Sequence, residues 1–367
     1  MRCLGLVAAL TIGSTVIAAE PSPRKAVIEF GWDEPDTAFL RTQVAQLERS
    51  PFDGCVFHVN AQDHAGKPIS LTWEGWGKRR FADDVVKASR DDLRGFRPKR
   101  FTRNFLRFNM TPADVDWFDD FDPILANLKL AANLARDGRC AGILLDTEQY
   151  QGKLFSFRAR PASKTNGWNA YADQARRRGR DAMTALQDGF PDLAVLLTFG
   201  PSLTWEQSQG GKIALETVDY GLLAPFVGGM VEAAKGKTKI IDGYEQSYGF
   251  KKSSQFQASY RSMQASFDDL ARIDGVRREV LSAGFGLWLD FDWRSKGWNA
   301  SDPSKNHFTP ETFEIATRAA LERADEYVWI YTETPRWWTA AGTTEKLPDA
   351  YVAALKRARN GIRSDTD

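Results

Sequence analysis

The chain has 367 residues, of which 43% are hydrophobic and 26% are charged, a composition typical of globular proteins rather than disordered or fibrous ones. Its 49 lysines and arginines nearly cancel its 48 aspartates and glutamates, so the net charge favours neither nucleic acid nor an anionic membrane as a partner. The length suits one large α/β barrel, for which about 250 residues are typical before insertions.

The first 19 residues are expected to be a cleaved secretory signal peptide. A basic Met1-Arg2 start precedes a small, apolar run that ends at Ala19, and cleavage is expected after Ala18 or Ala19. The alternative is an uncleaved anchor helix, but the run contains Gly and Thr and is shorter than the roughly 20 residues that a membrane span requires. The sequence therefore predicts a secreted or periplasmic protein in which residues 20–367 form the catalytic barrel and nothing crosses a membrane after cleavage.

Short apolar runs alternate with longer helical segments along the rest of the chain, which is the pattern of parallel α/β proteins. The expected strands are Ala26–Phe30, Gly54–Val59, Asn104–Phe108, Ala141–Asp146, Leu193–Phe199, Lys239–Asp242, Gly284–Asp290 and Tyr327–Tyr331. The expected helices are Asp36–Arg49, Pro123–Arg136, Tyr171–Asp188, Gln255–Arg272, Pro310–Ala324 and Pro348–Arg359. Eight strands with helices between most of them predict an α/β fold, a single-domain (β/α)8 TIM barrel.

Two long loops, Asn60–Phe101 and Gln151–Ala170, follow expected strands. In a barrel such loops lie at the C-terminal face, where the active site is found. A doubly wound open sheet is the alternative fold, and as a nucleotide binder it would need a glycine-rich turn after its first strand. The actual turn, Gly31-Trp32-Asp33-Glu34-Pro35, lacks that pattern.

The fourth expected strand ends in two carboxylates, Asp146 and Glu148, separated by one residue. Side chains alternate along a strand, so if Leu144 faces the barrel interior, both carboxylates point into the mouth. Two carboxylates this close push the pKa of one of them upward, which suits a general acid. The structural alternative is that one of them caps a helix or pairs with an arginine.

The segment Ala141-Gly142-Ile143-Leu144-Leu145-Asp146-Thr147-Glu148 resembles the strand-four signature of chitinase-type glycoside hydrolases, which ends in Asp-x-Glu. In that family the glutamate is the acid, and the aspartate orients an acetamido group of the substrate. The earlier acidic positions of the signature are Ala141 and Leu144 here. The resemblance therefore implies only that Glu148 is the acid.

Other expected strands also end in acids beside aromatic residues. Strand six leads to Tyr244 and Glu245, strand seven ends at Asp290, and strand eight leads to Glu333. Glycoside hydrolysis needs one carboxyl group that protonates the leaving oxygen and a second that attacks the sugar or activates water. The catalytic candidates are Glu148 as acid/base, Asp146 or Glu245 as its partner, and Glu333 behind them.

Aromatic side chains at strand ends and in loops are expected to form a sugar platform, because the C–H face of a pyranose packs on an electron-rich ring. The candidate substrate-binding residues are Trp32, Asp33, His58, Arg107, Tyr244, Trp288, Asp290, Trp293, Tyr331 and Trp337. The alternative reading of a tryptophan is that it fills the core, as expected for Trp329. The pair Trp337-Trp338 is instead expected to be exposed, because exposed apolar patches mark binding sites.

The sequence predicts neither a metal nor a cofactor. The three histidines, His58, His64 and His307, form no ligand pattern, and no C-x-x-C, P-loop or Gly-x-Ser-x-Gly motif occurs. In the expected barrel, Cys55 and Cys140 open strands two and four, about 10 Å apart, whereas a disulfide needs Cα atoms within about 7 Å. We therefore expect two buried thiols.

These observations predict a metal-independent glycosidase that cleaves an extracellular or periplasmic oligo- or polysaccharide by carboxylate acid/base catalysis. Two other classes remain open: a non-catalytic carbohydrate-binding barrel, and a polysaccharide lyase or glycan esterase. A binding protein would tolerate the replacement of Glu148 by glutamine, whereas an enzyme would lose turnover and still bind.

Overall fold

The computed structural model describes residues 25–338 and 347–361, and the expected signal peptide lies outside these residues. Within them, nine hydrogen-bonded strands follow the order β10-β11-β1-β2-β5-β6-β7-β8-β9, and every pairing is parallel. They are β1 (Ala26–Glu29), β2 (Gly54–Phe57), β5 (Phe105–Asn109), β6 (Gly142–Asp146), β7 (Ala194–Leu197), β8 (Lys239–Asp242), β9 (Leu281–Ala283), β10 (Phe285–Trp288) and β11 (Tyr327–Tyr331).

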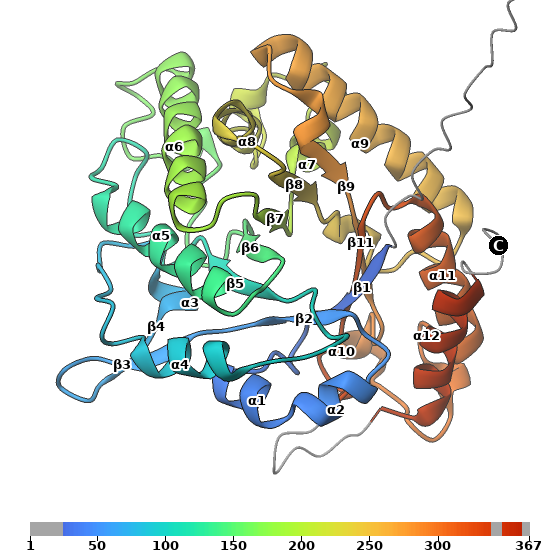
Figure 1. The fold of residues 1–367 in the computed structure, drawn as a ribbon. Coiled ribbons are helices and arrows are strands. Elements are labelled where there is room, and N and C mark those ends of the chain that lie inside the picture. The colour runs from blue at the N-terminus through green and yellow to red at the C-terminus, as the bar shows by residue number, and fades with distance from the viewer. Residues whose placement is uncertain (1–24, 339–346, 362–367) are drawn as a thin grey trace, which may run out of the picture.

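Gly284 separates β9 from β10, and the two short strands act as one strand of the barrel. β9 pairs with β8 and β10 pairs with β11, so the ring closes through this interrupted strand. Counting β9 and β10 together leaves eight strand positions around the ring, and the predicted (β/α)8 barrel is confirmed. Figure 1 shows the helices arranged around the strands.

The outer layer consists of helices that mostly match the expected ones. They are α1 (Thr37–Thr42), α2 (Val44–Arg49), α4 (Lys87–Gly95), α5 (Asp122–Asp137), α6 (Trp168–Gly189), α8 (Leu223–Ala233), α9 (Ser253–Asp274), α11 (Pro310–Arg323) and α12 (Asp349–Gly361). Local signals set several starts: Asp36 accepts a hydrogen bond from the Phe39 amide at α1, and proline occupies the first turn of α5 and α11. None of the described helices is long and apolar enough to span a membrane.

Two expectations about these elements are wrong in detail. The single helix expected at Asp36–Arg49 is broken at Gln43, which leaves the helical region with φ −107°. The expected loop 60–101 contains a hairpin and two helices: β3 (Asn60–Gln62), β4 (Pro68–Ser70), α3 (Leu71–Glu74) and α4. α8 was missed because it is apolar on nearly all sides, so it carries no amphipathic period.

Further short elements lie in the connections between strands and outer helices. They are the helices α7 (Pro201–Gln207) and α10 (Trp293–Lys296), and the 3-10 helices Phe157–Ala159, Leu215–Thr217, Glu245–Ser247, Arg278–Val280 and Pro303–Lys305. The 3-10 helix that begins at Glu245 and the helix α10 follow β8 and β10, so both lie at the carboxyl ends of barrel strands.

The hydrophobic core has two layers, one inside the barrel and one between the barrel and the helices. Alternation along the strands divides the residues: Ile28, Val56 and Leu144 face inward, whereas Val27 and Ile143 face the helices. Trp329 fills the barrel interior, and its indole Nε1 donates to the Gly243 carbonyl at 2.8 Å. The open mouth of the barrel therefore begins above the Trp329 ring.

Cys55 and Cys140 are both buried free thiols, as the strand arrangement predicted. Cys55 lies on β2 and Cys140 lies two residues before β6, with β5 between those two strands. Burial raises the pKa of both thiols. The cysteines therefore act as small apolar residues of the outer core.

Candidate active site

A cavity of about 470 Å³ opens at the carboxyl ends of the barrel strands. Its lining combines acids with aromatic rings from β1, β6, β8, β10 and β11 and the loops that follow them. The acids that line it are Glu148, Glu245 and Glu333. Carboxyl groups that follow three different strands therefore share one cavity at the mouth.

Asp146 is the last residue of β6, and its side chain is completely buried at the floor of this site. Its Oδ2 accepts from Arg107 Nη2 at 2.8 Å and from the Tyr150 hydroxyl at 3.1 Å. Its Oδ1 accepts from Thr198 Oγ1 and from the Glu148 amide, both at 3.1 Å. These four donors occupy both oxygens, so Asp146 is tied by hydrogen bonds to β5, to the end of β7 and to its own loop.

Arg107 connects two buried carboxylates below the cavity. Its Nη1 lies 2.8 Å from Glu34 Oε2, while its Nη2 reaches Asp146. The guanidinium also lies 5.0 Å from the ring centroid of Phe30 and 4.8 Å from that of Trp73. Burial alone would lower the pKa of Arg107, but the two carboxylates outweigh burial and raise it.

Glu148 and Glu245 are the two acids of the cavity lining whose pKa is raised. Burial raises the pKa of Glu148, and the nearby Asp146 charge raises it further, while a hydrogen bond from Tyr150 opposes the shift. Burial also raises the pKa of Glu245 well above the ordinary value, and the charges of Glu148 and Asp146 add to this. Since the Glu148 charge adds to the effect of burial on Glu245, the pair retains a proton at a pH where an ordinary glutamate is ionised.

Glu333 is held by four donors and is nearly inaccessible. Its Oε2 accepts from the Trp293 indole at 2.6 Å and from Arg294 Nε at 3.2 Å. Its Oε1 accepts from Arg294 Nη2 at 2.6 Å and from the Tyr331 hydroxyl at 3.1 Å. Asp290, buried behind it, accepts from the backbone amides of Glu333 and Thr334 at 3.1 and 2.8 Å.

Exposed aromatic rings gather beside these acids. Trp32 is 59% exposed, Trp73 is 40% exposed and Tyr150 is 45% exposed, although large apolar side chains are normally buried. All three line the cavity, and Trp73 and Tyr150 contact each other edge to face with centroids 5.6 Å apart. A cavity with exposed rings and acids of raised pKa has the chemistry expected of a ligand site.

The structure brings most of the predicted site residues together. Glu148, Glu245, Glu333, Trp32, Arg107, Trp288 and Tyr331 line the cavity. Asp146, Asp290 and Trp293 lie immediately behind it and bind the lining residues through hydrogen bonds.

Four predicted substrate-binding residues lie elsewhere. Tyr244 takes a left-handed backbone conformation with φ 46°, which turns its ring into the outer core, where its hydroxyl donates to Glu206 at 2.6 Å. His58 lies behind Glu34, with Nδ1 3.8 Å from that carboxylate. Asp33 accepts from the backbone amides of Trp337 and Trp338 and thereby anchors the last loop.

The expectation that Trp337-Trp338 forms an exposed platform is wrong. Trp338 is buried, and its indole donates to the Asp33 carbonyl at 2.9 Å. Trp337 is partly buried against Phe52, with ring centroids 4.7 Å apart and the planes at 86°. Phe52 lies in the loop before β2, far away along the chain, so neighbouring sequence could not reveal this contact.

Several cavity residues were not among the candidates. They are Phe30, Gly31, Trp73, Tyr150, Thr198, Tyr248 and Arg294. Tyr150 and Tyr248 carried a usable signal, because each follows a candidate acid by two or three residues. Trp73 and Arg294 lie in the segments that follow β2 and β10, and the path of these segments depends on the fold. Their neighbours in the sequence therefore did not indicate that they would reach the cavity.

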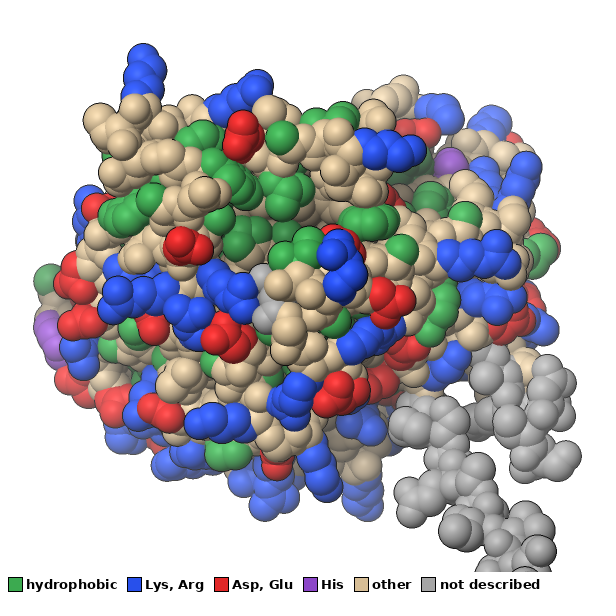
Figure 2. Space-filling view, turned by 90° about the horizontal axis from the view of Figure 1, so that it is seen from above, with side chains coloured by type: hydrophobic (Ala, Val, Ile, Leu, Met, Phe, Trp, Pro, Cys, Tyr) green, Lys and Arg blue, Asp and Glu red, His purple; other side chains and the backbone are tan. Residues whose placement is uncertain are grey.

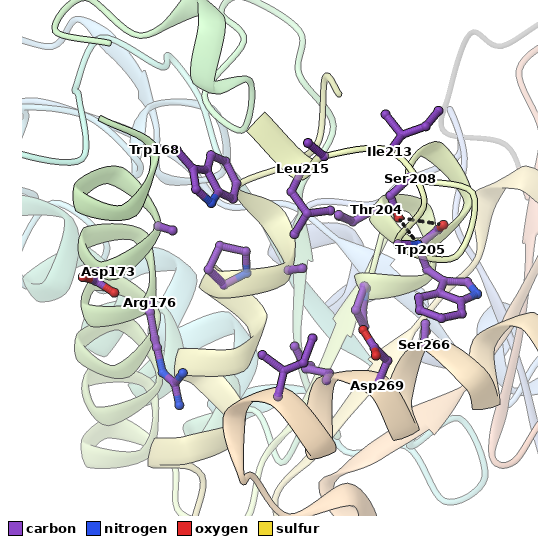
Figure 3. Close-up of a pocket in the computed structure, with 18 residues that line it drawn as sticks. Trp168, Asp173, Arg176, Thr204, Trp205, Ser208, Ile213, Leu215, Ser266 and Asp269 are labelled. Atoms are coloured by element: carbon purple, nitrogen blue, oxygen red, sulfur yellow. Dashed lines mark hydrogen bonds between the residues drawn. The ribbon is translucent and has the colours of Figure 1, made fainter. Parts of the chain in front are cut away.

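A second hollow, of about 440 Å³, lies on the outer side of the barrel between α6, α7, α8 and α9. Figure 2 shows hydrophobic side chains gathered in it, and Figure 3 shows Trp168 and Trp205 on different sides. Its hydroxyl groups donate to backbone carbonyls, as in Thr204 to Tyr220 at 2.7 Å and Ser266 to Met263 at 2.8 Å. Its two acids, Asp173 on α6 and Asp269 on α9, lie on different sides of the hollow (Figure 3).

Across 25–338 and 347–361, no group of three or more His, Cys, Asp and Glu side chains is arranged to hold a metal ion. The acids of the mouth instead face arginine, tyrosine and tryptophan donors.

No family model and no curated protein matches the chain. Among solved structures it is similar to an endocellulase from Pyrococcus horikoshii with cellotetraose, at 12% identity and TM-score 0.46, covering 91% of this chain and 92% of that one. A broad-specificity endoglucanase from Clostridium longisporum matches at 10% and 0.45, covering 88% and 86%. A chitinase from Flavobacterium johnsoniae matches at 10% and 0.38, covering 92% and 95%.

These three similarities are too distant to assign a family or a substrate to this chain. The barrel itself follows from the order and parallel pairing of its strands.

Proposed function

We propose that this chain is a glycoside hydrolase in which Glu148 is the acid/base and Glu245 is the second carboxylate. One observation carries the proposal: these two carboxyl groups share the cavity, burial raises the pKa of both, and the charge of Glu148 raises that of Glu245 further. Among the described residues no cation forms an ion pair with either, whereas Asp146 and Glu333 are paired with arginines. The pair is therefore the part of the site that can transfer a proton.

The reaction needs a protonated carboxyl group beside an ionised one. Burial raises the pKa of both carboxyl groups, so the pair can hold one proton, which Glu148 donates to the glycosidic oxygen as the bond breaks. Glu245 then attacks the sugar directly or activates a water molecule, and the separation of the two carboxyl groups decides between these outcomes. Asp146 and Arg107 fix the end of β6, which keeps Glu148 in place.

The surroundings favour a sugar as the substrate. Trp32, Trp73 and Tyr150 offer exposed ring faces beside polar groups, a combination that binds the C–H face and the hydroxyls of a pyranose. We also propose that the protein acts outside the cytoplasm, on the basis of the apolar leader in residues 1–19.

The test is hydrolysis of a panel of soluble oligosaccharides by the wild-type chain and by Glu148→Gln and Glu245→Gln. We expect each substitution to lower kcat by at least about a hundredfold and to leave binding nearly unchanged, because glutamine keeps the shape and removes the proton. The control is Glu216→Gln, which changes an exposed acid away from the cavity.

Three results would contradict the proposal. One is full turnover by Glu148→Gln. Another is oligosaccharide binding by the wild-type chain with no hydrolysis, which would indicate a binding protein. The third is an unsaturated product that absorbs in the near ultraviolet, which would indicate a lyase.

A further inference from the structure

Glu333 lies in the active-site cavity, yet its contacts are those of a structural anchor. Both of its oxygens are occupied by donors from Trp293, Arg294 and Tyr331, and only 4% of the residue is exposed. A carboxylate with every acceptor position engaged gains little by accepting a proton or attacking a sugar. The role of Glu333 therefore depends on the side chains to which it is hydrogen-bonded.

Those groups form a chain of hydrogen bonds that ends at the exposed ring of Trp32. The Trp32 indole Nε1 donates to the Tyr331 hydroxyl at 3.2 Å, and that hydroxyl donates to Glu333 at 3.1 Å. The Arg336 guanidinium lies 5.8 Å from the Trp32 ring centroid. Although Trp32 is 59% exposed, its orientation is therefore fixed from its polar edge, which leaves a ring face for a ligand.

On the other side Glu333 fixes Arg294. The guanidinium uses Nε and Nη2 for Glu333, and it lies 5.6 Å from the Trp288 ring centroid and 5.9 Å from that of Trp293. No described residue accepts from its Nη1, and the side chain is 61% exposed at the cavity. The Nη1 group of Arg294 is thus a fixed donor for a ligand that lies on the rings of Trp32 and Trp288.

The charges of the cavity decide which kind of sugar fits. Its two cations are already balanced, because Arg294 pairs with Glu333 and Arg107 pairs with both Glu34 and Asp146. The other acids of the lining, Glu148 and Glu245, add negative charge or none, and no further cation among the described residues lines the cavity. An anionic sugar would therefore enter a cavity without surplus positive charge, at a cost in repulsion and desolvation.

We propose that Trp32, Tyr331, Glu333 and Arg294 form a subsite for a neutral sugar, in which Glu333 is a positioning residue and acidic glycans are excluded. This deepens the proposed glycosidase function. The sugar lies on the Trp32 ring, and Arg294 Nη1 donates to one of its hydroxyls. A lyase acting on a uronic acid is disfavoured by the same charges, since both cavity arginines already bind carboxylates.

The test measures direct binding by the quenching of tryptophan fluorescence, which does not require turnover. The probes are neutral tetrasaccharides of glucose, mannose, xylose and N-acetylglucosamine, and an acidic tetrasaccharide of galacturonic acid. We expect millimolar or tighter binding of at least one neutral probe and no binding of the acidic one. Glu148→Gln should retain this binding.

Variants then separate positioning from catalysis. Trp32→Ala should weaken the neutral probe at least about tenfold, about 1.4 kcal/mol. Tyr331→Phe removes only the hydroxyl that links Trp32 to Glu333, and it should raise KM several-fold while kcat and the pH profile stay close to wild type. Trp168→Ala, in the outer hollow, is the matched control and should bind normally.

Three results would contradict the subsite as proposed, and a fourth would separate it from the proposed function. Tighter binding of the acidic probe does so, as does the absence of binding by every neutral probe. Loss of kcat with an unchanged KM in Glu333→Gln would make Glu333 catalytic instead. A chain that binds neutral probes through Trp32 but hydrolyses none would contradict the proposed function while supporting the subsite.

Discussion

Arg107 offers the sharpest test of how the site is held together. Its side chain is 11% exposed and lies 2.8 Å from each of two carboxylates, on Glu34 and Asp146, which are 10% and 0% exposed. Arg107→Met keeps most of the apolar volume but leaves both carboxylates buried without a cation. Removing one partner of a buried ion pair costs about 3–5 kcal/mol, and the second stranded carboxylate places the loss at the upper end.

The measurement is urea denaturation at pH 7, followed by tryptophan fluorescence. Arg107→Lys should lose less than Arg107→Met, because it keeps a charge but cannot bridge both carboxylates with one ammonium group. Arg94→Met is the control, since the Arg94 side chain is 57% exposed in its pair with Asp137 and such pairs contribute about 0–1 kcal/mol. A loss in Arg107→Met no larger than that of Arg94→Met would refute the reasoning.

Three further substitutions probe other parts of the argument. Tyr150→Phe removes a hydrogen bond that lowers the pKa of Glu148, so the alkaline limb of kcat/KM should move to higher pH, and an unmoved limb would argue against Glu148 as acid. Trp338→Ala should cost about 3–5 kcal/mol in urea, because the ring is buried, whereas an exposed platform residue would cost little. Burial raises the pKa of Glu29 well above the ordinary value, and both of its oxygens lack a partner among the described residues. The folded chain therefore keeps a proton on Glu29 above the pKa of the unfolded chain. Glu29 should contribute a fall in stability of about 1.4 kcal/mol per pH unit until it ionises in the folded state, and Glu29→Gln should reduce the slope of unfolding free energy between pH 5 and 8 by that amount.

The barrel was predictable because its strands are buried on both faces. Runs such as Tyr327–Tyr331 and Lys239–Asp242 are apolar and short, and the structure gives these two strands the expected bounds. Parallel strands also end at one face of a barrel whatever their register. For that reason acids at strand ends could be expected to meet without knowledge of any long-range contact.

The direction of side chains beyond the strand ends was not predictable in the same way. Alternation holds through Asp146, since Leu144 faces the inner core, but β8 ends at Asp242 and the next turn breaks the period. The left-handed backbone at Tyr244 sends that ring into the outer core, while Glu245 enters the cavity. A period of two is informative only while the chain remains extended.

The division of labour among the acids depends on contacts that sequence spacing does not encode. Asp146, Glu148, Glu245 and Glu333 all come from the ends of strands or the turns after them, and spacing alone treats them alike. In the structure, Asp146 receives Arg107 from β5 and Glu333 receives Arg294 from α10, so each of these two acids has a cation partner. Glu148 and Glu245 have no cation partner among the described residues and face one another's charge, so a proton shared between them is the cheapest way to relieve the repulsion. Because arginines pair with Asp146 and Glu333, Glu148 and Glu245 remain as the proposed catalytic pair.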